Sequence, residues 1–136
     1  MPFVRITLPE GLAPGIPEIV SRAVHRNLIR EFLIPPDDYF QILEEVPGSR
    51  KRYPARYLEI DHSALVTFIQ IIAAQGRTED QKKRLYAGIA RDIASDTPIP
   101  AEDVIIVLVE NAGAQNWSFG KGEIQALVHL TPQVSP

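Results

Sequence analysis

The sequence contains no cysteine, which excludes disulfide bonds and thiolate metal ligands throughout its 136 residues. It also lacks a strong charge of either sign, because 17 acidic against 14 basic residues leave a net charge of -3. Such a balance does not favour nucleic acid or an anionic membrane as a partner. No apolar run approaches the roughly 20 residues of a membrane-spanning helix, and the first residues lack the pattern of a signal peptide. We therefore expect a cytoplasmic protein with neither kind of partner.

The composition is that of one globular domain spanning residues 1–136. Hydrophobic residues make up 45% of the chain, which suffices for a packed core. A chain of this length leaves little room for two separate cores. The 12 prolines and 8 glycines divide it into several short elements.

Apolar spacing and turn residues predict alternating strands and helices. We expect strands over residues 3–8, 39–43, 57–60, 65–73 and 104–109. A first helix begins near Pro17, because apolar residues recur at every fourth position: Val20, Val24, Leu28 and Phe32. A second helix begins after Thr78, which forms an S/T-x-x-E/Q capping box with Gln81, and ends before the prolines at 98 and 100.

The two halves of the chain resemble one another when shifted by 65 residues. IPPDDYFQILEE (34–45) then aligns with IPAEDVIIVLVE (99–110), with 5 identities in 12 positions. The same shift aligns the apolar stripes of the two predicted helices. We interpret the chain as two pseudo-repeats, about 2–64 and 65–130, each a β-α-β unit with parallel strands and a right-handed crossover.

Two such units most simply form one four-stranded mixed sheet of the α+β class, with both helices on one face. The strand VIIVLV (104–109) has no polar alternation, so both of its faces should be buried. The helices can cover only one face. We therefore expect the other to meet a second subunit in a homo-oligomer.

The candidate site begins at Pro2. Removal of the initiator methionine would leave a prolyl secondary amine, and an α-amino group has a pKa near ~8 that burial or a nearby cation lowers. Such an amine can act as acid or base near neutral pH. The alternative is that the Met-Pro sequence at the start of the chain has no catalytic role.

A carboxylate and a guanidinium are expected beside Pro2. If the first strands of the two halves pair antiparallel at the centre of the sheet, Asp38, Gln75 and Arg77 lie at the edge where Pro2 begins the first strand. Arginine recognises carboxylates through paired hydrogen bonds, so the group suits a small carboxylate or oxo-acid substrate. Asp103 is the repeat counterpart of Asp38. The Asp38 side chain could therefore instead stabilise its turn by hydrogen-bonding nearby backbone amides. Arg77 could be an ordinary solvated turn residue.

These residues resemble the tautomerase superfamily, specifically the malonate semialdehyde decarboxylase group. The resemblance rests on Pro2 and on IPPDDYFQIL, AAQGRTEDQK and ENAGAQNWSFGKG, and it extends to about residue 130. It implies a homotrimer in which an amino-terminal proline decarboxylates malonate semialdehyde to acetaldehyde. Related activities in the group are tautomerisation and hydration.

The resemblance also assigns roles to single residues. Pro2 matches the catalytic proline, Asp38 the aspartate that positions or activates water, and Arg77 the arginine that binds the substrate carboxylate. Gln75 stands where one branch of the group carries a second arginine. Trp117 and Phe119 match part of an apolar wall of the pocket, although core or subunit-contact roles are also open to them.

Several alternatives stay open. The basic cluster Arg50, Lys51, Arg52 and Arg56 is either a solvated loop or a patch that steers an anionic substrate. His25, His62 and His129 lack metal-ligand spacing, and we expect neither a metal nor a cofactor. The resemblance leaves three activities open as the main one: decarboxylation, keto–enol tautomerisation and hydration of a small unsaturated acid. If Met1 is retained, a non-catalytic oligomeric binding module remains.

Overall fold

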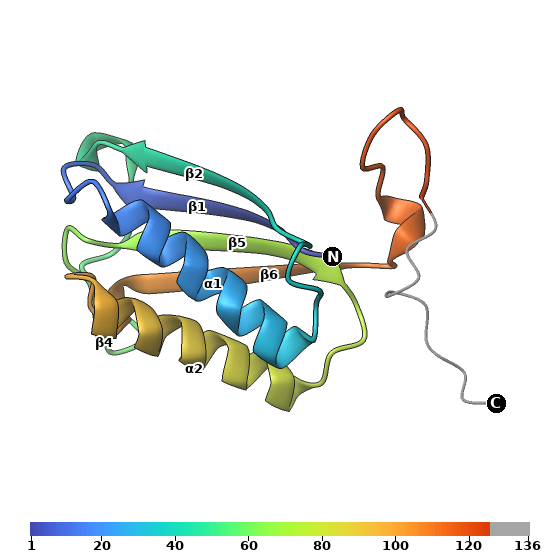
Figure 1. The fold of residues 1–136 in the computed structure, drawn as a ribbon. Coiled ribbons are helices and arrows are strands. Elements are labelled where there is room, and N and C mark those ends of the chain that lie inside the picture. Colours follow the sequence, from blue (N-terminus) through green and yellow to red (C-terminus); the bar gives the residue numbers. More distant parts are fainter. Residues whose placement is uncertain (126–136) are drawn as a thin grey trace.

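A four-stranded mixed sheet carries two helices on one face (Figure 1). The computed structural model describes residues 1–125. The strands β1 (Phe3–Pro9), β2 (Phe40–Val46), β5 (Thr67–Ala74) and β6 (Val104–Asn111) lie in the order β2-β1-β5-β6. β1 is parallel to β2 and β5 is parallel to β6, whereas the central pair β1 and β5 is antiparallel. The predicted α+β fold of tandem β-α-β units is confirmed.

The helices α1 (Ile16–Phe32) and α2 (Glu79–Asp96) begin close to the predicted positions. Ile16 precedes Pro17 as the first residue of α1. The capping box of α2 is confirmed, because the Thr78 hydroxyl accepts from the Gln81 amide at 3.1 Å and the Thr78 amide donates to Gln81 Oε1 at 2.9 Å. These two bonds satisfy amide groups that an uncapped helix would leave without a partner.

The single strand predicted over residues 57–60 is wrong. The segment forms a small hairpin of β3 (Arg56–Tyr57) and β4 (Ile60–Asp61), turned at Leu58 and Glu59. Both turn residues have positive φ angles, 50° and 64°. Tight hairpin turns of this kind usually contain Asn or Gly, so the sequence carried no recognisable turn signal here. Short 3-10 turns follow or precede strands at η1 (Gly48–Arg50), η2 (Ala101–Asp103) and η3 (Ala114–Asn116).

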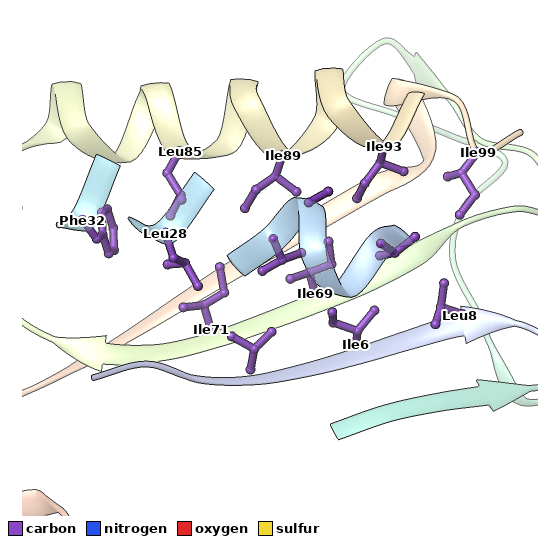
Figure 2. Close-up of a cluster of buried hydrophobic side chains, with 14 of the residues drawn as sticks. Ile6, Leu8, Leu28, Phe32, Ile69, Ile71, Leu85, Ile89, Ile93 and Ile99 are labelled. Carbon is purple, nitrogen blue, oxygen red and sulfur yellow. The ribbon is translucent and has the colours of Figure 1, made fainter. Parts of the chain in front are cut away.

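The core lies between the sheet and the two helices (Figure 2). Alternate residues of β1 and β5 point toward the helices, and the apolar stripes of α1 and α2 meet them. The largest side chains of this core are buried: Ile6, Leu8, Leu28, Phe32, Ile69, Ile71, Leu85, Ile89, Ile93 and Ile99. Each such side chain contributes about 1.5–3 kcal/mol when it is removed from water.

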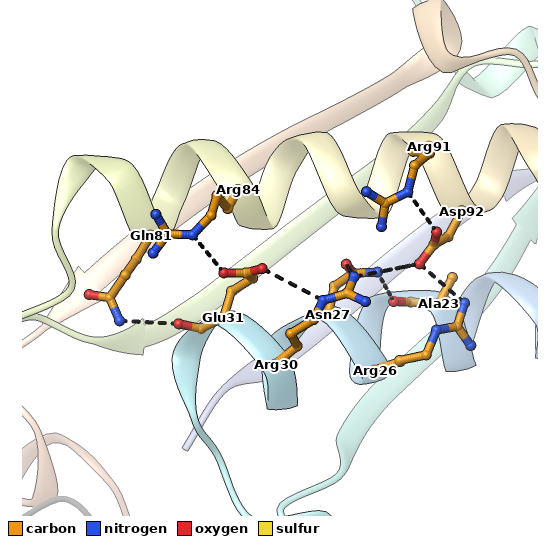
Figure 3. Close-up of polar contacts among 9 residues, drawn as sticks. All are labelled: Ala23, Arg26, Asn27, Arg30, Glu31, Gln81, Arg84, Arg91 and Asp92. Atoms are coloured by element: carbon orange, nitrogen blue, oxygen red, sulfur yellow. Dashed lines mark hydrogen bonds and ion pairs between the residues drawn. The ribbon is translucent and has the colours of Figure 1, made fainter.

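A polar network joins α1 to α2 beside this core (Figure 3). Asn27 is buried and donates to the Ala23 carbonyl at 2.7 Å and to Asp92 at 2.9 Å. Gly88 of α2 faces it, and a Cβ at this position would overlap Asn27 Oδ1. A glycine is therefore needed for the two helices to approach this closely around a buried amide.

The other face of the sheet carries apolar side chains that the helices do not cover. Val107 and Val109 of β6 are 53% and 42% exposed, and Phe40 and Ile42 of β2 are also exposed.

Within residues 1–125, neither helix is long and apolar enough to cross a membrane. The pseudo-repeat origin of the two halves stays a prediction, and residues 126–130 of the second repeat lie outside the described part.

Candidate active site

The antiparallel central pair of strands brings distant segments to one edge of the sheet, namely the side on which β1 and β2 begin and β5 and β6 end. Phe3 at the start of β1 lies opposite Ile72 near the end of β5 and opposite Phe40 at the start of β2. The backbone amide of Gln75 donates to the carbonyl of Asn111 at the end of β6, at 2.7 Å. The N-terminus is therefore located beside the end of β5 (Figure 1). Asp38, Gln75 and Arg77 surround this edge, as the predicted pairing requires.

Asp38 contacts the N-terminal amine. Its carboxylate lies 2.7 Å from the Met1 α-amine, and Asp38 and Met1 are 7% and 1% exposed. Because Met1 is present here, the nitrogen of Pro2 is an amide. The titratable amine therefore belongs to Met1, whereas the sequence interpretation placed it on Pro2. One residue spans at most about 3.6 Å, so the Pro2 nitrogen lies within roughly 6 Å of the carboxylate.

Four effects set the pKa of this amine. Burial is the largest and lowers the pKa, because it disfavours the ammonium form. The hydrogen bond and the negative charge of Asp38 act to raise it, and the positive charge of Arg77 lowers it again. The net shift is downward, from an ordinary value of 8.0. This direction moves the pKa of the terminal amine toward neutral pH, where such a group can act as acid or base.

Arg77 is held by backbone carbonyls rather than solvated. Its guanidinium donates to the Ala74 carbonyl at 2.9 Å and to the Phe32 carbonyl at 3.1 Å, and it lies 4.8 Å from the centre of the Phe32 ring. Burial lowers its pKa, while Glu110 and Asp38 act to raise it. A guanidinium has five N–H donors, so these two bonds leave others for a carboxylate ligand. Arg77 also joins the end of α1 to the end of β5.

Asp103, the repeat counterpart of Asp38, has different surroundings. It is fully buried and accepts hydrogen bonds from the backbone amide and the hydroxyl of Ser63. Asp103 thus fixes a loop before β5. Asp38 directs its carboxylate toward the chain terminus instead, so the two turns are not equivalent.

Trp117 and Phe119 form one wall of an apolar groove at this edge of the sheet. Their rings stack in parallel with centres 5.5 Å apart, and the Phe119 ring lies 5.1 Å from that of Phe40. The indole nitrogen donates to Asn111 Oδ1 at 3.2 Å, which ties the wall to the end of β6. The groove has a volume of about 420 Å³, and Phe3 also lines it.

The sequence interpretation missed some of these residues. Phe3 and Phe40 were not assigned to the groove, although parallel pairing of strands starting near residues 3 and 40 would have made them neighbours.

Gln75 is exposed. Lys51 is not part of a solvated loop, since it is 8% exposed and donates to the Val66 carbonyl at 2.7 Å. In residues 1–125 no three His, Asp or Glu side chains cluster closely enough to hold a metal ion.

Comparison with known proteins agrees with the fold. The family model described as "Tautomerase enzyme" matches residues 38–120. "Probable tautomerase YusQ" of Bacillus subtilis (strain 168) is 37% identical over 93% of this chain and 99% of its own length. The crystal structure of FG41 malonate semialdehyde decarboxylase inhibited by 3-bromopropiolate superposes with a TM-score of 0.81 at 33% identity, covering 90% of this chain and 92% of that one. A second malonate semialdehyde decarboxylase structure gives a TM-score of 0.80 at 26% identity, covering 90% and 93%. The chain therefore belongs to the tautomerase family.

Proposed function

We propose that this tautomerase-family chain uses the amine of Pro2, once Met1 has been removed, to decarboxylate malonate semialdehyde or a closely related small oxo acid. The proposal rests above all on one observation, the convergence of the N-terminal amine, Asp38 and Arg77 at one edge of the sheet. The likeness to two malonate semialdehyde decarboxylase structures supports this choice of first substrate.

The residues have complementary parts in such a reaction. Arg77 binds the substrate carboxylate with the N–H groups that the Ala74 and Phe32 carbonyls leave available. The protonated Pro2 amine polarises the aldehyde oxygen, so that the electron pair of the breaking C–C bond is accepted as an enolate. Carbon dioxide leaves, and a proton added at the former α-carbon gives acetaldehyde. Asp38 holds the amine and positions water, while the wall of Trp117 and Phe119 limits solvent around the carboxylate.

The apolar outer face of the sheet supports a homotrimer. Exposed apolar side chains lie on both outer strands of the sheet, and they include Val107, Val109 and Ile42. Exposure of such an apolar surface to water is unfavourable. Burial between identical subunits would remove it from solvent without another partner protein. This proposal agrees with the trimer that the sequence resemblance implies.

The test is turnover of malonate semialdehyde by the chain whose intact mass shows Pro2 at its start. We expect acetaldehyde release from the unmodified protein and its loss in Pro2→Ala and Arg77→Ala. Because Arg77 also joins α1 to β5, the thermal midpoint of each variant is measured, and Arg77→Lys keeps the charge without the paired donors. Arg91→Ala, an exposed arginine on α2, is the matched control and should keep full activity. Equal turnover in Pro2→Ala would refute the proposal.

Keto–enol tautomerisation is the second candidate, and the aromatic groove favours it. A groove of about 420 Å³ lined by Phe3, Phe40, Trp117 and Phe119 would accept a flat apolar group attached to an oxo acid. Comparing kcat/KM for an arylpyruvate, an acetylenic acid and malonate semialdehyde ranks tautomerase, hydratase and decarboxylase activities. If the mature chain retains Met1, a non-catalytic oligomeric binding module is the alternative, and absence of all three activities in protein that begins at Pro2 would favour it.

A further inference from the structure

A polar row on α1 contacts the turn that carries Asp38. His25 is 7% exposed, and its Nε2 lies 2.7 Å from the carbonyl oxygen of Pro36. Its ring stacks on that of Tyr39, with centres 3.8 Å apart and an interplanar angle of 29°. The two contacts fall on the residues at either side of the Asp37–Asp38 pair, so one side chain holds both ends of a short segment.

The partners determine where the hydrogens lie. A carbonyl oxygen only accepts, so His25 Nε2 must carry the hydrogen of this bond. Ser21 has one hydroxyl hydrogen and donates it to Gln41 Oε1 at 2.7 Å. The Tyr39 hydroxyl, 2.6 Å from Ser21 Oγ, must therefore be the donor to Ser21. Tyr39 is thus fixed at its hydroxyl by α1 and at its ring face by His25.

Backbone hydrogen bonds within the turn and the ion pair of Asp38 with the N-terminal amine also hold this segment. Pro36, Asp37 and Tyr39 are exposed, whereas Asp38 between them is buried. The local backbone bonds are Asp38 N to Pro35 O at 3.0 Å and Tyr39 N to Asp37 O at 2.9 Å, and both lie within the turn itself. A carboxylate is better solvated in water than in a buried site, so a loosened turn would carry Asp38 outward. The contacts with α1 oppose this movement.

We propose that His25 and Tyr39 are positioning residues that clamp residues 36–39 against α1 and thereby hold the Asp38 carboxylate against the N-terminal amine. The inference rests on the proposed function of that amine and deepens it. Neither residue touches the amine, so each acts through Asp38. A misplacement of about 1 Å can reduce an enzymatic rate by roughly 100-fold, so the clamp is expected to affect kcat strongly.

The first experiment compares two substitutions of one residue. His25→Phe keeps a stacked ring but removes the N–H donor, whereas His25→Gln places an amide N–H near the position of Nε2. We expect His25→Phe to lower kcat by about 10- to 100-fold with little change in KM, because Arg77 binds the carboxylate from another element. His25→Gln should restore most of the rate. Loss of the rate in both variants to the same extent, or a normal kcat in folded His25→Phe, would overturn the proposal.

The chain offers a matched control in His62. Its Nδ1 also lies near a proline carbonyl, that of Pro54 at 3.0 Å, and its ring meets Tyr53 edge to face. This pair belongs to an exposed loop at the opposite edge of the sheet. His62→Phe should therefore leave kcat unchanged, and a decrease equal to that of His25→Phe would show that the effect is not specific to the Asp38 turn.

A second readout does not depend on turnover. The pKa of the N-terminal amine is measured by ¹⁵N NMR with the label on whichever residue intact mass shows to be first. Asp38→Asn removes a charge that raises this pKa, so it should lower the value. His25→Phe should lower it in the same direction, and His25→Gln should not. If the unmodified protein turns over no oxo acid, the proposed function fails while this titration still tests the clamp; an unchanged pKa in His25→Phe or Asp38→Asn refutes the clamp.

Discussion

Retention of Met1 should abolish catalysis at this site. In the structure the Met1 side chain is 1% exposed and its amine lies 2.7 Å from Asp38, while the Pro2 nitrogen is an amide without a basic lone pair. A chain that keeps Met1 therefore lacks the proposed acid–base group. It also carries a side chain and a charge in the space beside Asp38.

The size of the effect follows from these two losses. Positioned acid–base groups contribute roughly 10²- to 10⁴-fold to a rate, which is the expected decrease in kcat. Burial of a methionine side chain is worth about 1.5–3 kcal/mol. A substrate that must displace Met1 would bind roughly 10- to 150-fold more weakly, since 1.4 kcal/mol is a factor of ten. Together these give a decrease in kcat/KM of at least about 10³-fold.

The assay uses two preparations that differ only in Met1. One is expressed with methionine removal blocked, the other without, and intact mass identifies each. Treatment of the first preparation with a methionine aminopeptidase should restore activity to the level of the second, which controls for misfolding. Equal kcat/KM values in the two preparations before treatment would refute the role of a free Pro2 amine.

Three further predictions concern the fold and the assembly. Gly88→Ala should lower the free energy of unfolding by about 1–2 kcal/mol in urea titration, because overlap with Asn27 outweighs a gain of about 1 kcal/mol in helix propensity; Gly48→Ala, whose new Cβ would meet nothing within 4 Å, should not destabilise the protein. Burial acts to raise the pKa of Asp92, but hydrogen bonds from Asn27 and two arginines hold it below its ordinary value. The stability this gives is present above the unfolded pKa of about 3.9 and is lost as the pH falls through the lower folded value, so the difference in unfolding free energy between the wild-type protein and Asp92→Asn should shrink as the pH falls below about 4. Val107→Lys on the open face of the sheet should dissociate the oligomer in sedimentation velocity, and an intact trimer would contradict burial of that face.

Much of the fold was predictable because its signals are local. The capping box at Thr78, the apolar stripe that includes Val20 and Leu28, and the internal similarity at a shift of 65 residues all lie within short windows of sequence. They led to the strand order and to the meeting of Asp38 and Arg77 with the chain terminus. The hairpin at residues 56–61 was mispredicted, because Leu58 and Glu59 adopt positive φ angles without the usual turn residues.

The sequence by itself determined the β-α-β units, since hydrophobic period and turn chemistry are local properties of the chain. The antiparallel pairing of the two units was a hypothesis at that stage, and from it followed the edge of the sheet at which the candidate residues meet. Only the tertiary structure showed what each of the two repeat-related aspartates binds. Asp38 and Asp103 follow the same local pattern, but Ser63 binds one and the N-terminal amine binds the other. It also decided that His25 holds the turn of Asp38 and that Arg77 is bound by the Phe32 carbonyl. Most of these contacts join residues far apart in sequence, and their geometry depends on how the elements pack, which no local pattern specifies.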